Sequence, residues 1–235
     1  MKALEPDLCY LCGKTLSEPT NDDHVPPHGF FPPEIRRTHN LNNLITVPVH
    51  TACNEAYKRD EEYFIYSLYP FLLDTYVGEV MRKHIREKFH AGDRQKLVGR
   101  IMAEFDHRPS GLVLPFNQVI KRFDSKRIER VLWKIVRGLN FHHHNGVLPE
   151  TWQCWWSFST REDCEPPEHF KLFMPLPDNE PYGDYQAVFS YRFRHLMEEG
   201  VSFHYWALLI WDSILVTIRF HDPACTCQQC VPRPV

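Results

Sequence analysis

The sequence has no long apolar run and no apolar leader at its beginning. None of its stretches reaches the roughly 18 consecutive apolar residues that indicate a membrane-spanning helix. Its first residues, MKALEPDLCYLCGK, lack the apolar centre of a secretory signal peptide. These two absences predict a protein without a membrane segment and with a cytoplasmic location.

The sequence also lacks internal repeats, low-complexity linkers and a large net charge. The net charge is only −3, whereas 43% of the residues are hydrophobic, enough for a packed core. The charge is uneven, because residues 81–137 contain 15 Lys and Arg against 6 Asp and Glu. A basic centre between acidic flanks favours a polyanionic partner, most readily DNA, although solvated helix faces would give the same balance.

The texture of the sequence changes twice, which predicts an α+β protein in three segments. Residues 1–66 are rich in turns, prolines and metal-ligand residues, and such a core-poor segment needs a metal ion to fold. Residues 67–145 are expected to form a basic helical region. Residues 146–235 contain short aromatic and β-branched runs, which predict a mostly antiparallel sheet. The sequence does not indicate the role of this sheet, and binding of a protein partner is one candidate. Within it, LLIWDSILVTIRF predicts two strands around a tight Asp212-Ser213 turn.

The clearest helical pattern is FDSKRIERVLWKIVRG, residues 123–138. Its apolar residues recur on one stripe, Asp124 or Ser125 can cap its start, and Gly138 is expected to end it. Further helices are expected over residues 54–90, with a break near Tyr69-Pro70, and over residues 94–105. The opposite face of the clearest helix is basic, and we expect it to contact nucleic acid through Lys126, Arg127, Arg130, Lys134 and Arg137.

The cysteines fall into clusters whose spacing favours metal binding over disulfides. Cys9-x-x-Cys12 and His50-x-x-Cys53 together form a Cys3His set that suits tetrahedral zinc. A redox role for the CxxC pair would need a βαβ context, which is missing. A second group near the C-terminus offers either ligands for another zinc ion or a set of free thiols: His221, Cys225, Cys227 and Cys230.

A proline-rich stretch, NDDHVPPHGFFPP, lies between the two ligand pairs Cys9-x-x-Cys12 and His50-x-x-Cys53, which we call zinc knuckles. The motifs follow one another as Cys9-x-x-Cys12, Asp23-His24-Val25-Pro26-Pro27, Asn43-Leu44 and His50-x-x-Cys53-Asn54. In this order they resemble the HNH endonucleases of the zinc-containing ββα-metal type, over about residues 7–66. The remaining three quarters of the chain resemble no family known to us.

The resemblance implies a metal-dependent endonuclease that hydrolyses phosphodiester bonds of DNA. His24 corresponds to the general base that activates water, and Asn43 to the asparagine that orients it. Asp23 and Asn54 correspond to ligands of a catalytic Mg²⁺ or Mn²⁺ ion, while the knuckles would hold a structural Zn²⁺ ion. The chemistry agrees, because an imidazole titrates near neutral pH and a hard cation prefers carboxylate and amide oxygens.

Three departures from the motif leave alternatives open. His50 stands where the family commonly has cysteine. Asn43 is two residues further from Asn54 than in the compact motif, so the stand-ins are Asn42, Asn40 and His39. Adjacent residues on a regular strand face opposite ways, so Asp23 and His24 share a site only where the strand bends, and Asp22 is the other candidate ligand. The alternative function is a non-catalytic zinc module that binds nucleic acid or a protein.

Overall fold

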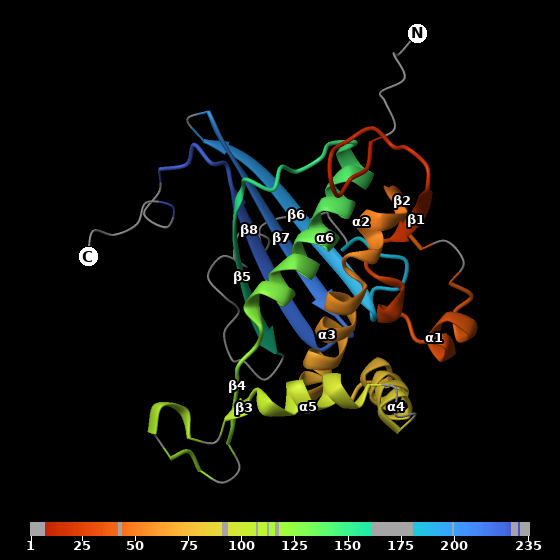
Figure 1. Ribbon diagram of the computed structural model, residues 1–235, viewed down its shortest axis with the longest axis vertical. Coiled ribbons are helices and arrows are strands. Elements are labelled where there is room, and N and C mark those ends of the chain that lie inside the picture. Colours follow the sequence, from red (N-terminus) through yellow and green to blue (C-terminus); the bar gives the residue numbers. More distant parts are fainter. Residues whose placement is uncertain are drawn as a thin grey trace.

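A computed structural model describes residues 8–41, 44–90, 94–106, 108–111, 113–115, 118–160, 181–198, 200–226 and 230. It is an α+β fold in which a long helix lies across a four-stranded antiparallel sheet, and a small two-stranded sheet with further helices lies on the other side of that helix (Figure 1). The mixed fold class and the antiparallel C-terminal sheet expected from the sequence are thereby confirmed.

The N-terminal part begins with two short strands that pair antiparallel, β1 (Thr20–His24) and β2 (Thr46–His50). A 3₁₀ turn (His28–Phe30) and helix α1 (Pro33–Thr38) lie between them in the chain. Helices α2 (Thr51–Glu55) and α3 (Lys58–Leu68) follow β2 directly. The paired strands β1 and β2 with the helices α2 and α3 form a strand–strand–helix unit, into which the 3₁₀ turn and α1 are inserted between the strands.

The middle of the chain is helical, as expected. A 3₁₀ turn at Tyr69–Phe71 interrupts the helical stretch near Pro70, and α4 (Tyr76–His90) and α5 (Gln95–Ala103) follow. Pro70 lacks a backbone N–H and so cannot donate the hydrogen bond that would continue α3, although Tyr69 before it keeps helical angles and the chain becomes extended only at Leu72. Two two-residue strands, β3 (Phe105–Asp106) and β4 (Ile120–Lys121), then pair antiparallel.

Helix α6 (Ser125–His144) starts where the sequence predicts, because the Asp124 side chain accepts a hydrogen bond from the Arg127 N–H. Its predicted end at Gly138 is wrong. Gly138 lies inside the helix. A Cβ atom at this position would come within 2.5 Å of a Val25 methyl group, so glycine allows the helix to pack closely against the residue that follows β1. The helix ends at Asn145, whose left-handed backbone (φ 52°) is a common C-terminal cap.

The large sheet has the strand order β5-β8-β7-β6 and consists of β5 (Gln153–Thr160), β6 (Phe189–Glu198), β7 (Val201–Ile210) and β8 (Ile214–His221). The β7–β8 turn lies one residue earlier than predicted. Its central residues are Trp211 and Asp212, both with positive φ, and the Ser213 N–H donates to the Ile210 carbonyl at 3.1 Å. Two positive φ angles match the twist of hairpin strands.

One hydrophobic core includes residues from all three segments of the sequence. Phe30 of the N-terminal part packs on Phe64 and Trp211, with ring centroids 5.8 and 5.3 Å apart. The indole N–H of Trp211 donates to the Phe30 carbonyl at 3.0 Å. The N-terminal part is thus attached directly to the turn of the large sheet. Among the helices of the described residues, none combines the length and apolar character needed to cross a membrane.

Candidate zinc sites and candidate active-site cleft

The four ligands predicted for the first zinc site lie together. Cys9 and Cys12 flank a tight turn closed by the Gly13 N–H on the Cys9 carbonyl, while His50 ends β2 and Cys53 lies in α2. Their ligand atoms all lie within 4.8 Å of one another. The His50 Nδ1 atom is 3.4 Å from the Cys12 sulfur and 3.9 Å from the Cys53 sulfur. Tetrahedral zinc would place these atoms about 3.6 Å apart, so the cluster can hold a zinc ion.

The acidity of the thiols also favours a cation in this cluster. Burial opposes ionisation of Cys9, but hydrogen bonds from the backbone of His50, Cys12 and Leu11 outweigh it and lower the pKa of Cys9 to about 7. Burial and then the negative charge of Cys9 raise the pKa of Cys53 to about 12. The Cys53 thiolate therefore forms readily only beside a positive ion, as a bound metal provides.

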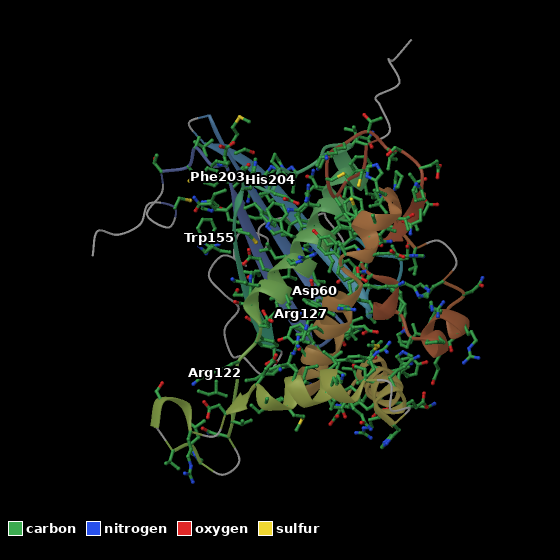
Figure 2. All side chains as sticks on the ribbon, viewed as in Figure 1. Asp60, Arg122, Arg127, Trp155, Phe203 and His204 are labelled. Carbon is green, nitrogen blue, oxygen red and sulfur yellow. The ribbon has the colours of Figure 1, made fainter. Side chains whose placement is uncertain are left out.

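A second cluster lies where β8 leaves the large sheet. His221, Cys225 and Cys230 place their ligand atoms within 4.8 Å of one another, and Cys227 lies outside the described residues. The His221 Nδ1 atom is 3.5 Å from the Cys225 sulfur and 3.3 Å from the Cys230 sulfur, again close to zinc geometry. The rings of Trp155 and Phe203 pack on His221 at 4.7 and 4.9 Å (Figure 2). This cluster can hold a metal ion through three described ligands.

A cleft of 240 Å³ lies beside the first zinc cluster, between β1, the 3₁₀ turn and helices α2 and α3. Its walls are Asn21, Asp22, Asp23, His24, Pro27, His28, Gly29, Asn54, Glu55, Lys58 and Glu61. His24 is half-buried, and its ring centroid lies 5.0 Å from that of His28. The cleft thus brings together three of the residues that the resemblance singles out: Asp23, His24 and Asn54.

The strand does not bend between Asp23 and His24. Both residues keep their antiparallel partners on β2, Val47 and Thr46, so their side chains leave opposite faces of β1. Asp23 is only 6% exposed, and its carboxylate accepts a hydrogen bond from the Tyr10 hydroxyl at 2.5 Å. Asp22 shares the strand face of His24 and is exposed, which is the arrangement expected of the alternative ligand.

The Asp23 carboxylate also contacts an ammonium group. Lys134 of α6 places its Nζ atom 2.9 Å from Asp23 Oδ2 and 2.9 Å from Asn54 Oδ1, and it pairs with Glu61 as well. Burial is the main cause that raises the pKa of Glu61, although Lys134 opposes it. The oxygens of Asp23 and Asn54, which the resemblance assigns to a divalent cation, are therefore already bound to the Lys134 ammonium. In this arrangement they do not fit a Mg²⁺ or Mn²⁺ ion.

Asn43 and its stand-in Asn42 lie outside the described residues, so the orienting asparagine stays a prediction. Of the other two stand-ins, neither Asn40 nor His39 lines the cleft. His39 stacks on Tyr185 with ring centroids 4.2 Å apart.

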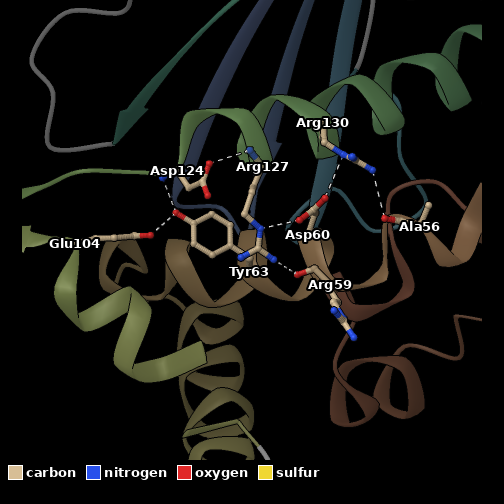
Figure 3. A network of polar contacts seen from close by, with 8 residues as sticks. All are labelled: Ala56, Arg59, Asp60, Tyr63, Glu104, Asp124, Arg127 and Arg130. Atoms are coloured by element: carbon tan, nitrogen blue, oxygen red, sulfur yellow. Dashed lines mark hydrogen bonds and ion pairs between the residues drawn. The ribbon is translucent and has the colours of Figure 1, made fainter. Parts of the chain in front are cut away.

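The predicted basic face of α6 is largely turned toward α3 and not to solvent. Arg127 pairs with Asp60 at 2.6 Å and donates to the Arg59 carbonyl, and Arg130 reaches the same Asp60 carboxylate at 3.1 Å (Figure 3). Lys134 and Arg137 are buried, at 1% and 3% exposure. The five predicted contact residues are therefore not all exposed, because the acidic residues Asp60 and Glu61 of α3 lie against this face. Lys126 and half of the Arg130 side chain remain exposed.

Three residues of the site were not singled out from the sequence, Tyr10, His28 and Glu61, and neither was the inward direction of Lys134. His28 stands four residues after His24 in the same proline-rich stretch, and this proximity could have drawn attention to it. Glu61 follows Asn54 by seven residues, but the two lie in different helices, α2 and α3, so a helical spacing in the sequence could not have linked them. Nothing local in the sequence indicates that Lys134 reaches β1.

Comparisons with known proteins add no family assignment. No protein-family model, curated protein or solved structure matches the chain. The functional argument therefore depends on the chemistry of the residues described above.

Proposed function

We propose that the chain is an endonuclease that hydrolyses phosphodiester bonds of DNA, with His24 as the general base. The observation that carries the proposal is the position of His24 in the cleft, on a strand–strand–helix unit beside a Cys3His cluster. A zinc ion there would be structural, because its four ligands close the coordination shell and leave no position for substrate. This arrangement agrees with the resemblance to the HNH endonucleases.

The cleft contains the groups that hydrolysis requires apart from a metal ion. The His24 imidazole faces the open volume, where it can take a proton from water as the water attacks phosphorus. Lys58 is exposed, lines the same cleft and can neutralise the phosphate charge. Because Asp23 and Asn54 already contact Lys134, no step of this proposal is assigned to a divalent cation on those residues.

Exposed cations at the start of α3 and on α6 suit a DNA backbone. Lys58 and Arg59 lie at the start of α3, and Arg130 and Lys126 are exposed on the neighbouring helix α6. Sequence-independent contacts of this kind attach a protein to the phosphates and make its affinity salt-dependent. The proposed contact surface is therefore Lys58, Arg59, Lys126 and Arg130, a revision of the row predicted from α6 alone.

A second function is favoured by one specific observation. The ion pair between Asp23 and Lys134 neutralises a carboxylate that a catalytic site would use. A zinc module that binds nucleic acid or a protein without cutting would retain such a pair as ordinary architecture.

Plasmid cleavage separates the two functions. The purified chain is incubated with supercoiled plasmid in Mg²⁺, Mn²⁺ or EDTA, and His24→Ala is compared with His142→Ala, an exposed histidine on α6 outside the cleft. We expect His24→Ala to abolish nicking while zinc content, folding and DNA affinity persist, because a base acts mainly in the transition state. Equal nicking by both variants would refute His24 as the base. Loss of zinc or of folding in His24→Ala would make His24 structural.

A further inference from the structure

Three oxygens from three different elements converge on the ammonium of Lys134. Asp23 comes from β1, Asn54 from α2 and Glu61 from α3, and the ammonium reaches them from α6. Lys134 is 1% exposed, so water does not replace these contacts. The Tyr10 hydroxyl completes the group by donating to the Asp23 carboxylate. Burial and the Asp23 charge raise the pKa of Tyr10 well above its usual range, which keeps this hydroxyl a donor.

The arrangement around Lys134 is that of a cation site. A buried positive charge is tolerated only when it is paired and hydrogen-bonded, and two carboxylates and an amide oxygen provide this for Lys134. Carboxylate and amide oxygens are also the ligands of hard divalent cations, which require shorter oxygen distances of about 2.0–2.1 Å for Mg²⁺. The same oxygens can therefore serve an ammonium or a metal ion.

The Lys134 ammonium and a divalent metal ion cannot both bind the oxygens of Asp23 and Asn54. A divalent ion on Asp23 and Asn54 would lie next to the Lys134 ammonium, and like charges repel strongly where solvent does not screen them. Lys134 lies on the helix that also carries Arg130 and Lys126, whereas the oxygens belong to the strand–strand–helix unit. Occupation of the site by a metal ion would thus depend on a residue far along the chain from the motif.

We infer that Lys134 is the resident cation of the Asp23, Asn54 and Glu61 oxygens, and that Lys134 and a divalent cation exclude one another there. This competition matters for catalysis only if the proposed nuclease function holds, and in that respect the inference rests on that function. Lys134 thereby sets the charge around Asp23 and is assigned no contact with substrate.

Binding of Mn²⁺ alone tests the inference without any measurement of cleavage. The full zinc-loaded chain is titrated with Mn²⁺, and free Mn²⁺ is followed by electron paramagnetic resonance. The variants are Lys134→Met, Asp23→Asn and the double variant, with Lys126→Met as the control that makes the same charge change at an exposed position of the same helix. Zinc content and circular dichroism confirm that each variant is folded.

We expect Lys134→Met to lower the Mn²⁺ Kd by at least about tenfold, because it removes the competing charge next to the ligands. Lys126→Met should leave the Kd within about twofold, since an exposed charge is screened by solvent and salt. Adding Asp23→Asn to Lys134→Met should abolish the gain, whereas Asp23→Asn alone should change the Kd little. An unchanged Kd in folded Lys134→Met would overturn the inference, as would an equal gain in Lys126→Met.

If Lys134→Met does not fold, Lys134→Gln keeps a donor to Asp23 without the charge, and the same shift in Kd is expected. The results also separate this inference from the nuclease proposal. Tight Mn²⁺ binding by Lys134→Met without cleavage by any variant would leave the inference intact and remove the nuclease. Suppose instead that the unaltered chain cleaves in the presence of Mn²⁺ and that its Mn²⁺ Kd equals that of Lys134→Met. This result would support the nuclease and overturn the inference.

Discussion

At the scale of single residues, one close approach between the N-terminal unit and α6 depends on a missing side chain. Gly138 faces Val25, which follows directly on β1, and two Val25 methyl carbons lie 2.5 and 2.9 Å from the position of a Cβ atom. Glycine is otherwise a poor residue in a helix interior. Its presence here is explained by the approach of the chain next to His24.

This contact predicts opposite outcomes for two glycine substitutions. Gly138→Ala should lower the free energy of unfolding by about 1–3 kcal/mol, because overpacking outweighs the better helix propensity of alanine. Gly99→Ala in α5 has no atom within 4 Å of the new Cβ and should instead gain about 0.5–1 kcal/mol. Urea unfolding of both variants tests this. Equal gains in both would show that Val25 does not crowd Gly138.

At the scale of elements, the α3–α6 interface divides the basic residues of α6 into two groups with different roles. Arg127, Lys134 and Arg137 have acidic partners within the chain, Asp60, Glu61 and Glu150. The Tyr63 hydroxyl extends this interface by donating to Glu104 and accepting from the Asp124 N–H, and burial is the main cause that raises the pKa of Tyr63 to about 12 (Figure 3). Lys126 and Arg130 are the exposed members, although Arg130 also shares the Asp60 carboxylate with Arg127.

The division predicts which substitutions affect DNA and which affect folding. Replacing Lys126 and Arg130 by alanine should weaken DNA binding similarly on all sequences and reduce the salt slope by about one for each phosphate that the variant no longer binds. Arg127→Ala should instead lower the free energy of unfolding by about 1–3 kcal/mol, since it leaves the mostly buried Asp60 with only Arg130. Fluorescence anisotropy over a salt series and urea unfolding measure the two effects. A flat salt response would refute the phosphate contacts.

The large sheet carries a histidine pair that predicts acid sensitivity. His195 on β6 and His204 on β7 are direct cross-strand partners with ring centroids 3.8 Å apart. Burial, then neighbouring histidines, lower the pKa of His195 to about 3 and that of His204 to about 4. The pair is neutral when folded, whereas unfolded histidines bind protons below about pH 6.5. Stability should therefore be fully present above pH 6.5 and fall as the pH drops toward about 4.

Thermal unfolding between pH 8 and pH 4 tests this, with His195→Gln/His204→Gln against the unaltered chain. The double variant should lose part of the decrease in Tm, because carboxylates elsewhere contribute the rest. His142→Ala, an exposed histidine, serves as the control and should follow the unaltered chain. Parallel curves for all three proteins would show that the histidine pair does not titrate differently on folding.

The sequence predicts best those features that depend on neighbours along the chain. Each knuckle spans four residues, so the Cys9, Cys12, His50 and Cys53 ligands could be identified without the fold. The antiparallel sheet follows from alternation in short strands joined by tight turns. The interior position of Gly138 and the inward direction of Lys134 depend on β1, which is remote in the sequence. Their contacts are fixed only when α6 packs on that strand, so periodicity alone could not reveal them.

At the scale of the whole molecule, the two Cys/His clusters lie in different segments, one in the N-terminal unit and one at the end of β8. We predict up to two zinc ions per chain, measured by elemental analysis of protein purified without chelator. Cys12→Ala should remove one ion and unfold the N-terminal unit, because a structural zinc contributes roughly 10–16 kcal/mol of apparent binding energy. Cys225→Ala should remove the other ion and leave the first. A chain that contains no zinc would refute both sites.

The bond between the Trp211 indole and the Phe30 carbonyl has a mechanical consequence. Phe30 ends the 3₁₀ turn that begins with His28, so the hairpin turn of the large sheet is coupled through three residues to one wall of the cleft. A displacement of the β7–β8 turn would therefore move the Phe30 carbonyl, which directly follows the cleft residues His28 and Gly29. A fragment that ends at residue 66 would retain its four zinc ligands and lose the support of this wall. We therefore expect the width of the cleft to depend on the packing of the large sheet against Phe30.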